Sequence, residues 1–274
     1  MQGNELLAAA VEAAREAAAV HRTHLGQVRV EDWSEKGIAD FVTHVDRAAE
    51  AGIIARIRSR FPDHAVLAEE EASVRAGAAI NAEEWTWIVD PLDGTTNYLH
   101  SYPMYAVSIA AAHRGVVEAA CVLNSASGEE WTAVRGGGAF LNGQRARVSQ
   151  IDLLPRALIG TGFPFKAIDV LPEYTRQFEA VVRATAGVRR AGAAALDLCH
   201  VASGWFDGFW ELSLAPWDIA AGALLVREAG GMVTRLDGDD DILGHGAILA
   251  GNPAIHEQLG ALLQRVERTR VNVA

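Results

Sequence analysis

The spacing of hydrophobic residues changes along the chain, and each spacing predicts a different kind of element. Apolar residues recur at helical spacing in residues 5–20 and in residues 46–61, which predicts two amphipathic helices. Two short apolar runs, residues 65–67 and 87–89, predict buried strands. In residues 105–134 apolar and polar side chains alternate, which predicts three strands joined by turns. We therefore expect the first half of the chain to be rich in β-structure.

The second half of the chain has a different rhythm, in which short apolar runs alternate with helical patterns. The predicted strands cover residues 158–161, 188–190, 206–212 and 247–250, and the predicted helices cover residues 172–184, 194–202, 216–229 and the segment from Pro253 onward. This alternation is typical of an α/β layer. The change of rhythm near residues 148–155 divides the chain into residues 1–150 and 151–274, which we expect to form two subdomains of one compact unit.

Composition and charge exclude several classes of protein. Half of the 274 residues are apolar, which is enough for a substantial core, and the net charge is −11. This negative charge argues against general binding to nucleic acid or to anionic membranes. It does not exclude phosphate substrates, because bound cations would invert the sign locally.

The sequence also indicates a compartment. No apolar run approaches the roughly 18 residues of a membrane span. The first predicted helix carries Glu5, Glu12 and Arg15, so the N-terminus does not resemble a signal peptide. Cys121 and Cys199 lie far apart and form neither a C-x-x-C motif nor a disulfide framework. We expect a cytoplasmic protein in which both thiols are buried and reduced.

The candidate chemistry begins after the second apolar run, in the stretch Asp90-Pro91-Leu92-Asp93-Gly94-Thr95-Thr96-Asn97-Tyr98. Two carboxylates, Asp90 and Asp93, lie three residues apart at the end of a predicted strand. Gly94 allows the backbone to approach a ligand closely, and Thr95 or Thr96 can cap a short helix. Carboxylates beside a backbone carbonyl suit a hard cation such as Mg²⁺, and a helix N-terminus suits a phosphate. Together they suggest metal-assisted chemistry on a phosphate ester.

Four further acids follow a predicted strand or begin a predicted helix, namely Asp46, Glu69, Glu70 and Asp218. An isolated acid is more often a solvated surface residue. Asp90 and Asp218 differ, because both have apolar neighbours that predict burial. A buried carboxylate must be paired or must bind a metal.

Three motifs resemble those of a known family. D-P-L-D-G-T-T-N-Y is similar to the signature of the inositol monophosphatase family of Mg²⁺-dependent, lithium-sensitive phosphatases. W-D-x-A-A-G follows at Trp217–Gly222, and a G-E-E segment appears as Ala68-Glu69-Glu70. The resemblance covers about residues 5–265. It implies a layered αβαβα sandwich of the inositol monophosphatase and fructose-bisphosphatase type, a homodimer, and two or three Mg²⁺ ions per site.

The resemblance also implies roles for individual residues. One Mg²⁺ would be held by Glu69, Asp90 and the Leu92 carbonyl, a second by Asp90, Asp93 and Asp218, and a weaker third by Glu69. The predicted catalytic residues are Glu70, Thr95 and Asp46, of which Glu70 and Thr95 would orient and deprotonate the attacking water. The predicted substrate contacts are Glu69, Leu92, Asp93, Gly94, Thr95, Arg189, Gly192, Ala193, Ala194, Glu211 and Asp218.

Two departures from the family pattern concern metal affinity and substrate specificity. Ala68 stands where the family usually has Gly, so its Cβ could shift the backbone of Glu69. Ala193 stands where Ser or Thr is frequent, so one hydrogen bond to the substrate is missing. Glu211, the W-D-x-A-A-G form and the segment 161–165 favour inositol monophosphate as the substrate.

Other readings stay open. Relatives of this type hydrolyse fructose 1,6-bisphosphate, histidinol phosphate or 3′-phosphoadenosine 5′-phosphate. A haloacid-dehalogenase-type phosphatase needs D-x-D-G-T, but here the first acid, Asp90, lies one residue too far back. An EF-hand loop is broken by Leu92 and Gly94. A degenerate family member acting as an interaction module is disfavoured, because every acidic ligand is present.

Overall fold

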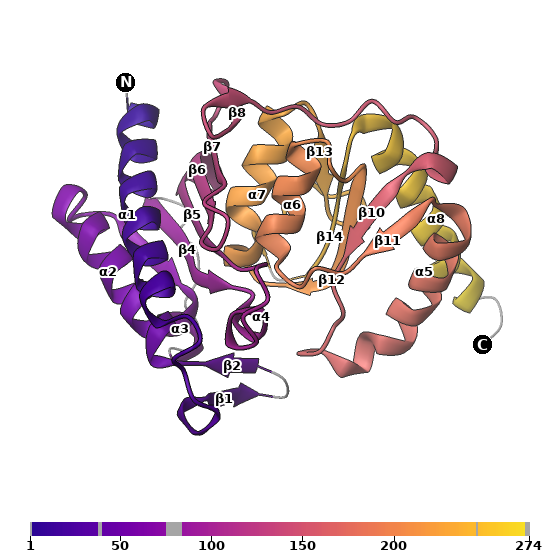
Figure 1. Ribbon diagram of the computed structural model, residues 1–274. Helices are drawn as coiled ribbons and strands as arrows, with labels where there is room; N and C mark the ends of the chain where they lie inside the picture. Colours follow the sequence, from indigo (N-terminus) through magenta and orange to yellow (C-terminus); the bar gives the residue numbers. More distant parts are fainter. Residues whose placement is uncertain (1, 38–39, 75–83, 245, 272–274) are drawn as a thin grey trace.

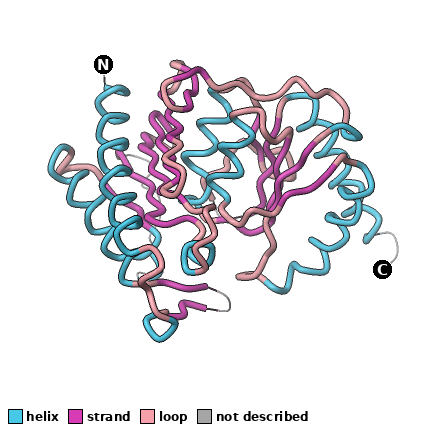
Figure 2. The backbone as a smooth tube through the Cα atoms, in the orientation of Figure 1, coloured by secondary structure: helices cyan, strands magenta, loops and turns pink. Residues whose placement is uncertain are grey.

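The described residues form five layers of alternating helices and sheets (Figures 1 and 2). The computed structural model describes residues 2–37, 40–74, 84–244 and 246–271. From one side to the other the layers are α1 with α2, a seven-stranded sheet, α6 with α7, a five-stranded sheet, and α5 with α8. The predicted layered αβαβα architecture is therefore confirmed.

The element bounds are as follows. The helices are α1 (Gln2–His24), α2 (His44–Arg60), α3 (Glu69–Val74), α4 (Thr95–Leu99), α5 (Leu171–Ala184), α6 (Ala194–Ala202), α7 (Pro216–Glu228) and α8 (Pro253–Val271). The seven-stranded sheet holds β3 (Ala65–Ala68), β4 (Trp85–Asp93), β5 (Ala106–His113), β6 (Val116–Asn124), β7 (Glu130–Val134), β8 (Gly138–Leu141) and β9 (Gln144–Arg145). The five-stranded sheet holds β10 (Leu158–Thr161), β11 (Gly187–Arg189), β12 (Gly208–Leu214), β13 (Met232–Thr234) and β14 (Gly246–Gly251), and β1 (Ser34–Gly37) pairs with β2 (Asp40–Val42).

The two sheets differ in topology. In the first, β3 and β4 are parallel, and β4 to β9 form an antiparallel meander in chain order. In the second, the order is β11-β10-β12-β14-β13, with β10 parallel to both of its neighbours. This second sheet needs helical crossovers between its parallel strands, which explains the strand–helix rhythm of the second half of the sequence.

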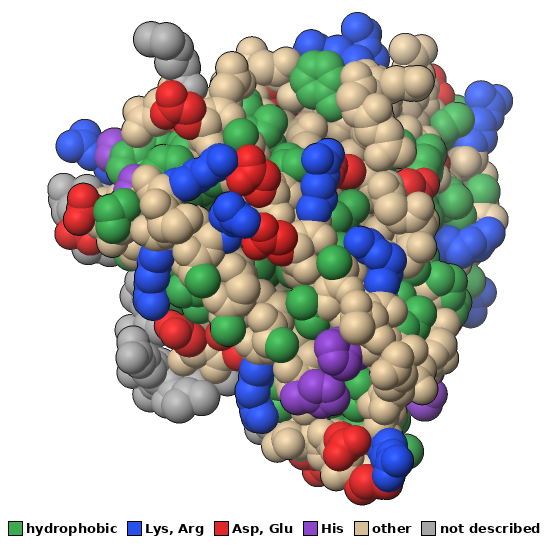
Figure 3. Space-filling model, turned by 60° about the vertical axis from the view of Figure 1, so that its left-hand side comes forward, with side chains coloured by type: hydrophobic (Ala, Val, Ile, Leu, Met, Phe, Trp, Pro, Cys, Tyr) green, Lys and Arg blue, Asp and Glu red, His purple; other side chains and the backbone are tan. Residues whose placement is uncertain are grey.

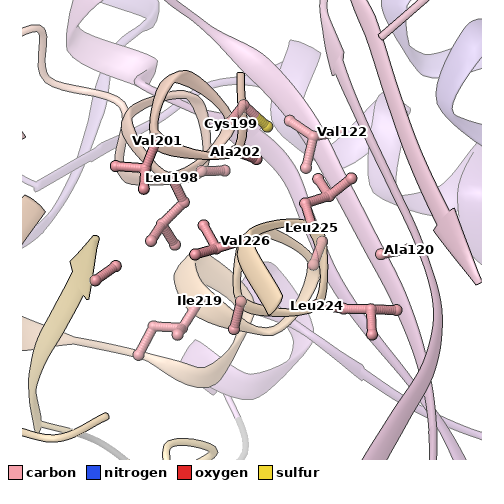
Figure 4. Packing of buried hydrophobic residues seen from close by; sticks show 14 of the residues in the cluster. Ala120, Val122, Leu198, Cys199, Val201, Ala202, Ile219, Leu224, Leu225 and Val226 are labelled. Carbon is pink, nitrogen blue, oxygen red and sulfur yellow. The ribbon is translucent and has the colours of Figure 1, made fainter. Parts of the chain in front are cut away.

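Small side chains allow the layers to approach closely. The inner face of α1 is mostly alanine, including Ala9, Ala13 and Ala17, and it packs on α2, β5 and β6. In the central layer α6 and α7 are buried on nearly all sides, and residues of both helices meet in Figure 4. A Cβ on Gly222 of α7 would lie 2.5 Å from the Cβ of Leu198 of α6. Glycine at this position therefore sets how closely the two helices pack.

The acidic stretch lies on a strand that extends beyond its predicted end. The apolar run at residues 87–89 predicts a strand that stops before Asp90, but β4 continues to Asp93. Its pairing with β5 shifts register between Asp90 and Asp93. Pro91, which has no N–H to donate, is accommodated within this irregularity. The two carboxylates thus lie on either side of a β-bulge at the end of a buried strand.

Two further details differ from the sequence prediction. The helical pattern of residues 172–184 predicts that Val182 of α5 points inward, yet Val182 is exposed, while Tyr174, Gln177 and Val181 are the buried residues of that helix. Strand β13 was not predicted, because it has only three residues at the edge of its sheet and Met232 is exposed. Cys121 and Cys199 are buried and free, as predicted.

Surface charges of both signs are interspersed on the face that Figure 3 shows. Arg60 of α2 pairs with Glu12 of α1 at 2.9 Å, and Arg15 of α1 pairs with Glu130 of β7 at 2.7 Å. Exposed pairs of this kind contribute little to stability, so the apolar layers hold the fold together. Within the described part of the chain, no helix has both the length and the apolar character needed to cross a membrane.

Candidate active site

A cavity of about 290 Å³ lies among the ends of β4, β10, β11 and β12 and the first turns of α3, α6 and α7. The predicted site residues on its wall are Glu69, Asp90, Leu92, Asp93, Gly94, Thr95, Gly192, Ala193, Ala194, Glu211 and Asp218. Both halves of the chain contribute to this wall. The fold thus brings the predicted metal ligands and most of the predicted substrate contacts together.

Backbone N–H groups hold one oxygen of each of three aspartates on the wall. Asp90 Oδ1 accepts a hydrogen bond from the backbone N–H of Leu92, at 2.9 Å. Asp93 Oδ2 accepts from Ala195 N in the first turn of α6, at 2.8 Å. Asp218 Oδ2 accepts from Ala215 N just ahead of α7, at 2.7 Å. The backbone therefore fixes where these three carboxylates lie.

The carboxylates on the wall raise one another's pKa. Burial is the largest cause for Asp90, and the charges of Glu69, Asp93 and Asp218 raise its pKa further, well above the ordinary value. Burial and the charge of Asp218 raise the pKa of Asp93 to about 8. A cluster of this kind favours a cation that takes the place of the protons.

The chemistry of the donors fits Mg²⁺, although the side chains do not converge as they stand. Carboxylate and carbonyl oxygens are the ligands that Mg²⁺ prefers. Yet within residues 2–37, 40–74, 84–244 and 246–271, no group of three or more His, Cys, Asp or Glu side chains is arranged to hold a metal ion.

A buried glutamate from α2 positions the acids at the start of α3. The Glu50 carboxylate accepts from the backbone N–H of Glu70 at 2.8 Å and from that of Glu71 at 3.0 Å. Glu69 lines the cavity, whereas Glu70 is buried behind the wall. The sequence prediction did not include Glu50. The available signal was its place on the inward face of α2, four residues after Asp46.

Asp46 also lies behind the wall and reaches the cavity through Thr95. The Thr95 hydroxyl lies 3.1 Å from Asp46 Oδ1 and 3.0 Å from the Leu92 carbonyl, to either of which it can donate. The backbone N–H and the hydroxyl of Thr43 donate to Asp46 Oδ2 at 2.9 and 2.7 Å. Asp46 was predicted as a catalytic residue; it does not line the cavity, and it contacts the wall through the Thr95 hydroxyl.

The arginine on the wall is Arg190, not the predicted Arg189. Arg189 ends β11, is exposed, and donates to the carbonyl of Val188. The guanidinium carbon of Arg190 lies 5.2 Å from the ring centre of Phe163 and 5.1 Å from that of Phe165. Successive side chains on an extended backbone point to opposite sides, so only one of the two arginines can face the cavity.

The substrate end of the wall is packed tightly around Glu211. A Cβ on Gly162 would collide with the Glu211 carboxylate, so a larger residue there would require the Glu211 side chain to move. Burial and the charge of Asp218 raise the pKa of Glu211 to about 8, and Arg190 opposes this shift.

The sequence analysis also gave no role to Asp197, Lys166 and Asn97, three polar residues of the wall. Asp197 of α6 lines the cavity, and Lys166 lies 3.8 Å from a carboxylate oxygen of Glu69. Asn97 donates to the carbonyl of Met104 at 2.7 Å and to that of Ala191 at 2.9 Å, which joins α4 to the approach to α6. The signal for Asp197 was an acid within an otherwise apolar helix. Asn97 stands within the acidic motif but was given no role, and nothing local in the sequence identified Lys166.

Comparisons with known proteins identify the family of this chain. The sequence model of the inositol monophosphatase family matches residues 2–268. A protein of Pseudomonas aeruginosa named Nus factor SuhB is 46% identical over 261 residues, covering 94% of this chain and 96% of that protein. Inositol-1-monophosphatase of Mesorhizobium japonicum is 42% identical over 98% of both chains. The structure of inositol monophosphatase from Anabaena has a TM-score of 0.85 at 37% identity and covers 97% of both chains, which confirms the predicted fold type.

Proposed function

Because this chain belongs to the inositol monophosphatase family, we propose that it is a Mg²⁺-dependent phosphomonoesterase that acts on inositol monophosphate or a similar polyol phosphate. The observation that carries this proposal is the carboxylate cluster on the cavity wall. Burial and repulsion raise the pKa of Asp90 and Asp93, a state that bound cations would relieve. The family is generally Mg²⁺-dependent, which supports the same conclusion.

Two or three Mg²⁺ ions per site would be held by this chain's own oxygens. One ion would be held by Glu69, Asp90 and the Leu92 carbonyl, a second by Asp90, Asp93 and Asp218, and a weaker third by Glu69. Bound there, Mg²⁺ supplies Lewis acidity toward the phosphate and neutralises charge that develops on its oxygens. The buried side of the cavity keeps water away from that charge.

Protein groups would orient the attacking water. The Thr95 hydroxyl, held between Asp46 and the Leu92 carbonyl, would position the water on the wall of the cavity, and Glu70 would take its proton once its carboxylate turns from behind the wall toward the cavity. Backbone N–H groups of Gly94 and Thr95 would donate to the phosphate oxygens. Attack by water in one step leaves no phosphorylated side chain.

Glu211→Gln should lower kcat/KM for myo-inositol 1-phosphate by about tenfold to a hundredfold. The reason is the loss of one charge-assisted hydrogen bond from a substrate hydroxyl, worth roughly 1.5–3 kcal/mol. Glycerol 2-phosphate offers fewer hydroxyl groups and should suffer less. Steady-state kinetics of both esters on both proteins measure the effect. Equal losses of kcat/KM for the two esters would show that Glu211 does not contact the substrate.

A phosphate-release screen tests the choice of substrate. Purified protein with Mg²⁺ would be given myo-inositol 1-phosphate, fructose 1,6-bisphosphate, histidinol phosphate and 3′-phosphoadenosine 5′-phosphate. We expect the highest kcat/KM for the inositol ester, because the acidic substrate end of the wall repels a second phosphate. A higher kcat/KM for one of the other three esters would assign the protein to the branch of the family that hydrolyses that ester.

The names of relatives support a second candidate function. The relatives from Pseudomonas aeruginosa, Vibrio cholerae and Escherichia coli, 41–46% identical, are named Nus factors, which suggests a role with the transcription machinery. The two functions are separable in a strain whose only copy carries a variant that cannot turn over substrate. Normal transcription in that strain would show that the Nus role does not depend on hydrolysis.

We also propose that the protein is a cytoplasmic homodimer. The exposed apolar side chains of Phe165, Ile168 and Leu171 support an interface on the second half of the chain.

A further inference from the structure

Asp197 is a buried acid that the roles above leave unused. It lies in α6, whose residues from Ala194 to Ala202 are all buried, and its own side chain is 1% exposed. Its Oδ1 is completely buried and accepts no hydrogen bond among the described residues. A carboxyl group removed from water without a partner is costly. In an apolar helix beside a cavity, such a group points to a ligand that donates a hydrogen bond.

The position of Asp197 places it next to Glu211. Both residues line the cavity, one from α6 and the other from β12. Burial is the largest cause that raises the pKa of Asp197, and the negative charge of Glu211 is the next. The two carboxyl groups therefore lie near enough to act on one another.

The surroundings of the two carboxyl groups combine close packing with positive charge. The backbone at Gly162 packs directly against the Glu211 carboxylate. Arg190, stacked on Phe163 and Phe165, lowers the pKa of both acids, and Lys166 lowers that of Glu211. These cations offset the two acids, which leaves this end of the cavity suited to neutral groups that form hydrogen bonds.

We propose that Asp197 and Glu211 together form a subsite that accepts hydrogen bonds from two hydroxyl groups of one polyol. This inference rests on the proposed phosphatase function and narrows its substrate class to phosphate esters with at least two free hydroxyl groups at the far end from the phosphate. The oxygen atoms of a carboxyl group accept hydrogen bonds from hydroxyl groups. A simple ester would leave both acids without a partner, whereas a cyclic polyol satisfies both.

Two variants of Asp197 test the subsite. Asp197→Asn keeps the shape but loses the charge, and Asp197→Ala removes the acceptor. For myo-inositol 1-phosphate we expect kcat/KM to fall about tenfold in the first and up to about a hundredfold in the second, mainly through KM. For p-nitrophenyl phosphate, which has no hydroxyl group, the fall should stay within about threefold. The matched control is Asp152→Asn, which changes an exposed acid and should alter neither ester.

Two further readouts separate a substrate contact from a structural or metal-binding role. The melting temperature of Asp197→Asn should equal or exceed that of the wild type, because the variant replaces a buried acid that lacks a hydrogen-bond partner with an amide of the same shape. The Mg²⁺ concentration for half-maximal activity should not change. A lower melting temperature, a shifted Mg²⁺ requirement, equal losses for the two esters, or no loss for either would overturn the proposal.

A binding measurement keeps the subsite testable if the proposed function fails. Failure of that function would show as no Mg²⁺-dependent hydrolysis of either ester by the wild type. In that case thermal shift with free myo-inositol and inorganic phosphate reports on the subsite alone. We expect stabilisation of the wild type and of Asp152→Asn but not of Asp197→Ala. Equal stabilisation of all three proteins would overturn the subsite.

Discussion

Asp93→Asn should leave the fold intact and lower turnover by more than about a hundredfold, since substitutions that only support a metal ligand already cost tenfold to a hundredfold. The asparagine Oδ1 can still accept the hydrogen bond that Ala195 N gives to Asp93 at 2.8 Å. What is lost is the negative charge at the centre of the acidic cluster. Phosphate release with saturating Mg²⁺, together with circular dichroism and thermal melting, measures both parts of the expectation.

The control for Asp93→Asn is again Asp152→Asn, which should keep wild-type turnover. Without Mg²⁺, the Asp93 variant should melt at or above the wild-type temperature, because repulsion within the cluster falls. Full activity of the variant would remove Asp93 from the metal site. A phosphorylated aspartate trapped at Asp90 or Asp93 would replace attack by water with a nucleophilic mechanism.

Gly94→Ala should lower turnover about a hundredfold, as expected when reacting groups move by about an ångström, and should also lower the melting temperature. Gly94 has φ +88° and precedes α4, and an added Cβ would lie 2.7 Å from the Met104 carbonyl oxygen. A left-handed conformation costs an alanine roughly 1–2 kcal/mol, and the clash adds to this. The backbone that carries Thr95 must then shift. Steady-state kinetics and thermal melting measure the two effects.

Gly143→Ala is the matched control for Gly94→Ala. Gly143 has φ +77°, but nothing lies within 4 Å of the Cβ that would be added. This variant carries the backbone strain without the clash, in a hairpin turn between β8 and β9. It should lose some stability and keep its turnover. If both variants lost turnover equally, close packing at Gly94 would not be what shapes the site.

Local sequence patterns were enough to predict the bounds of helices and strands whose ends are marked by turn residues. The helix predicted at residues 194–202 and the strand predicted at residues 158–161 have the observed bounds of α6 and β10. Turn residues flank both, and their apolar residues have one consistent spacing. The acidic motif was recognisable for the same reason, because its ligands lie within four residues of one another.

Long-range contacts were not predictable in the same way. Strand β4 continues through Pro91 because β5 pairs with it on both sides of the bulge. Glu50 and Asp46 act on α3 and Thr95, which are distant in the chain and meet them only in the folded protein. Arg189 was predicted where the structure places Arg190 on the wall, because the orientation of the short strand β11 decides which of the two side chains faces the cavity. The proposed metal ligands thus come from sequence motifs, whereas the residues that contact them from distant elements required the structure.

The most direct test of the account is phosphate release from myo-inositol 1-phosphate by the purified protein, measured with Mg²⁺, after chelation of all divalent cations, and after Mg²⁺ is added back. The acidic cluster predicts hydrolysis with Mg²⁺, none after chelation, and recovery when Mg²⁺ returns. Hydrolysis that continued at the same rate after full chelation would contradict the proposed metal-dependent mechanism.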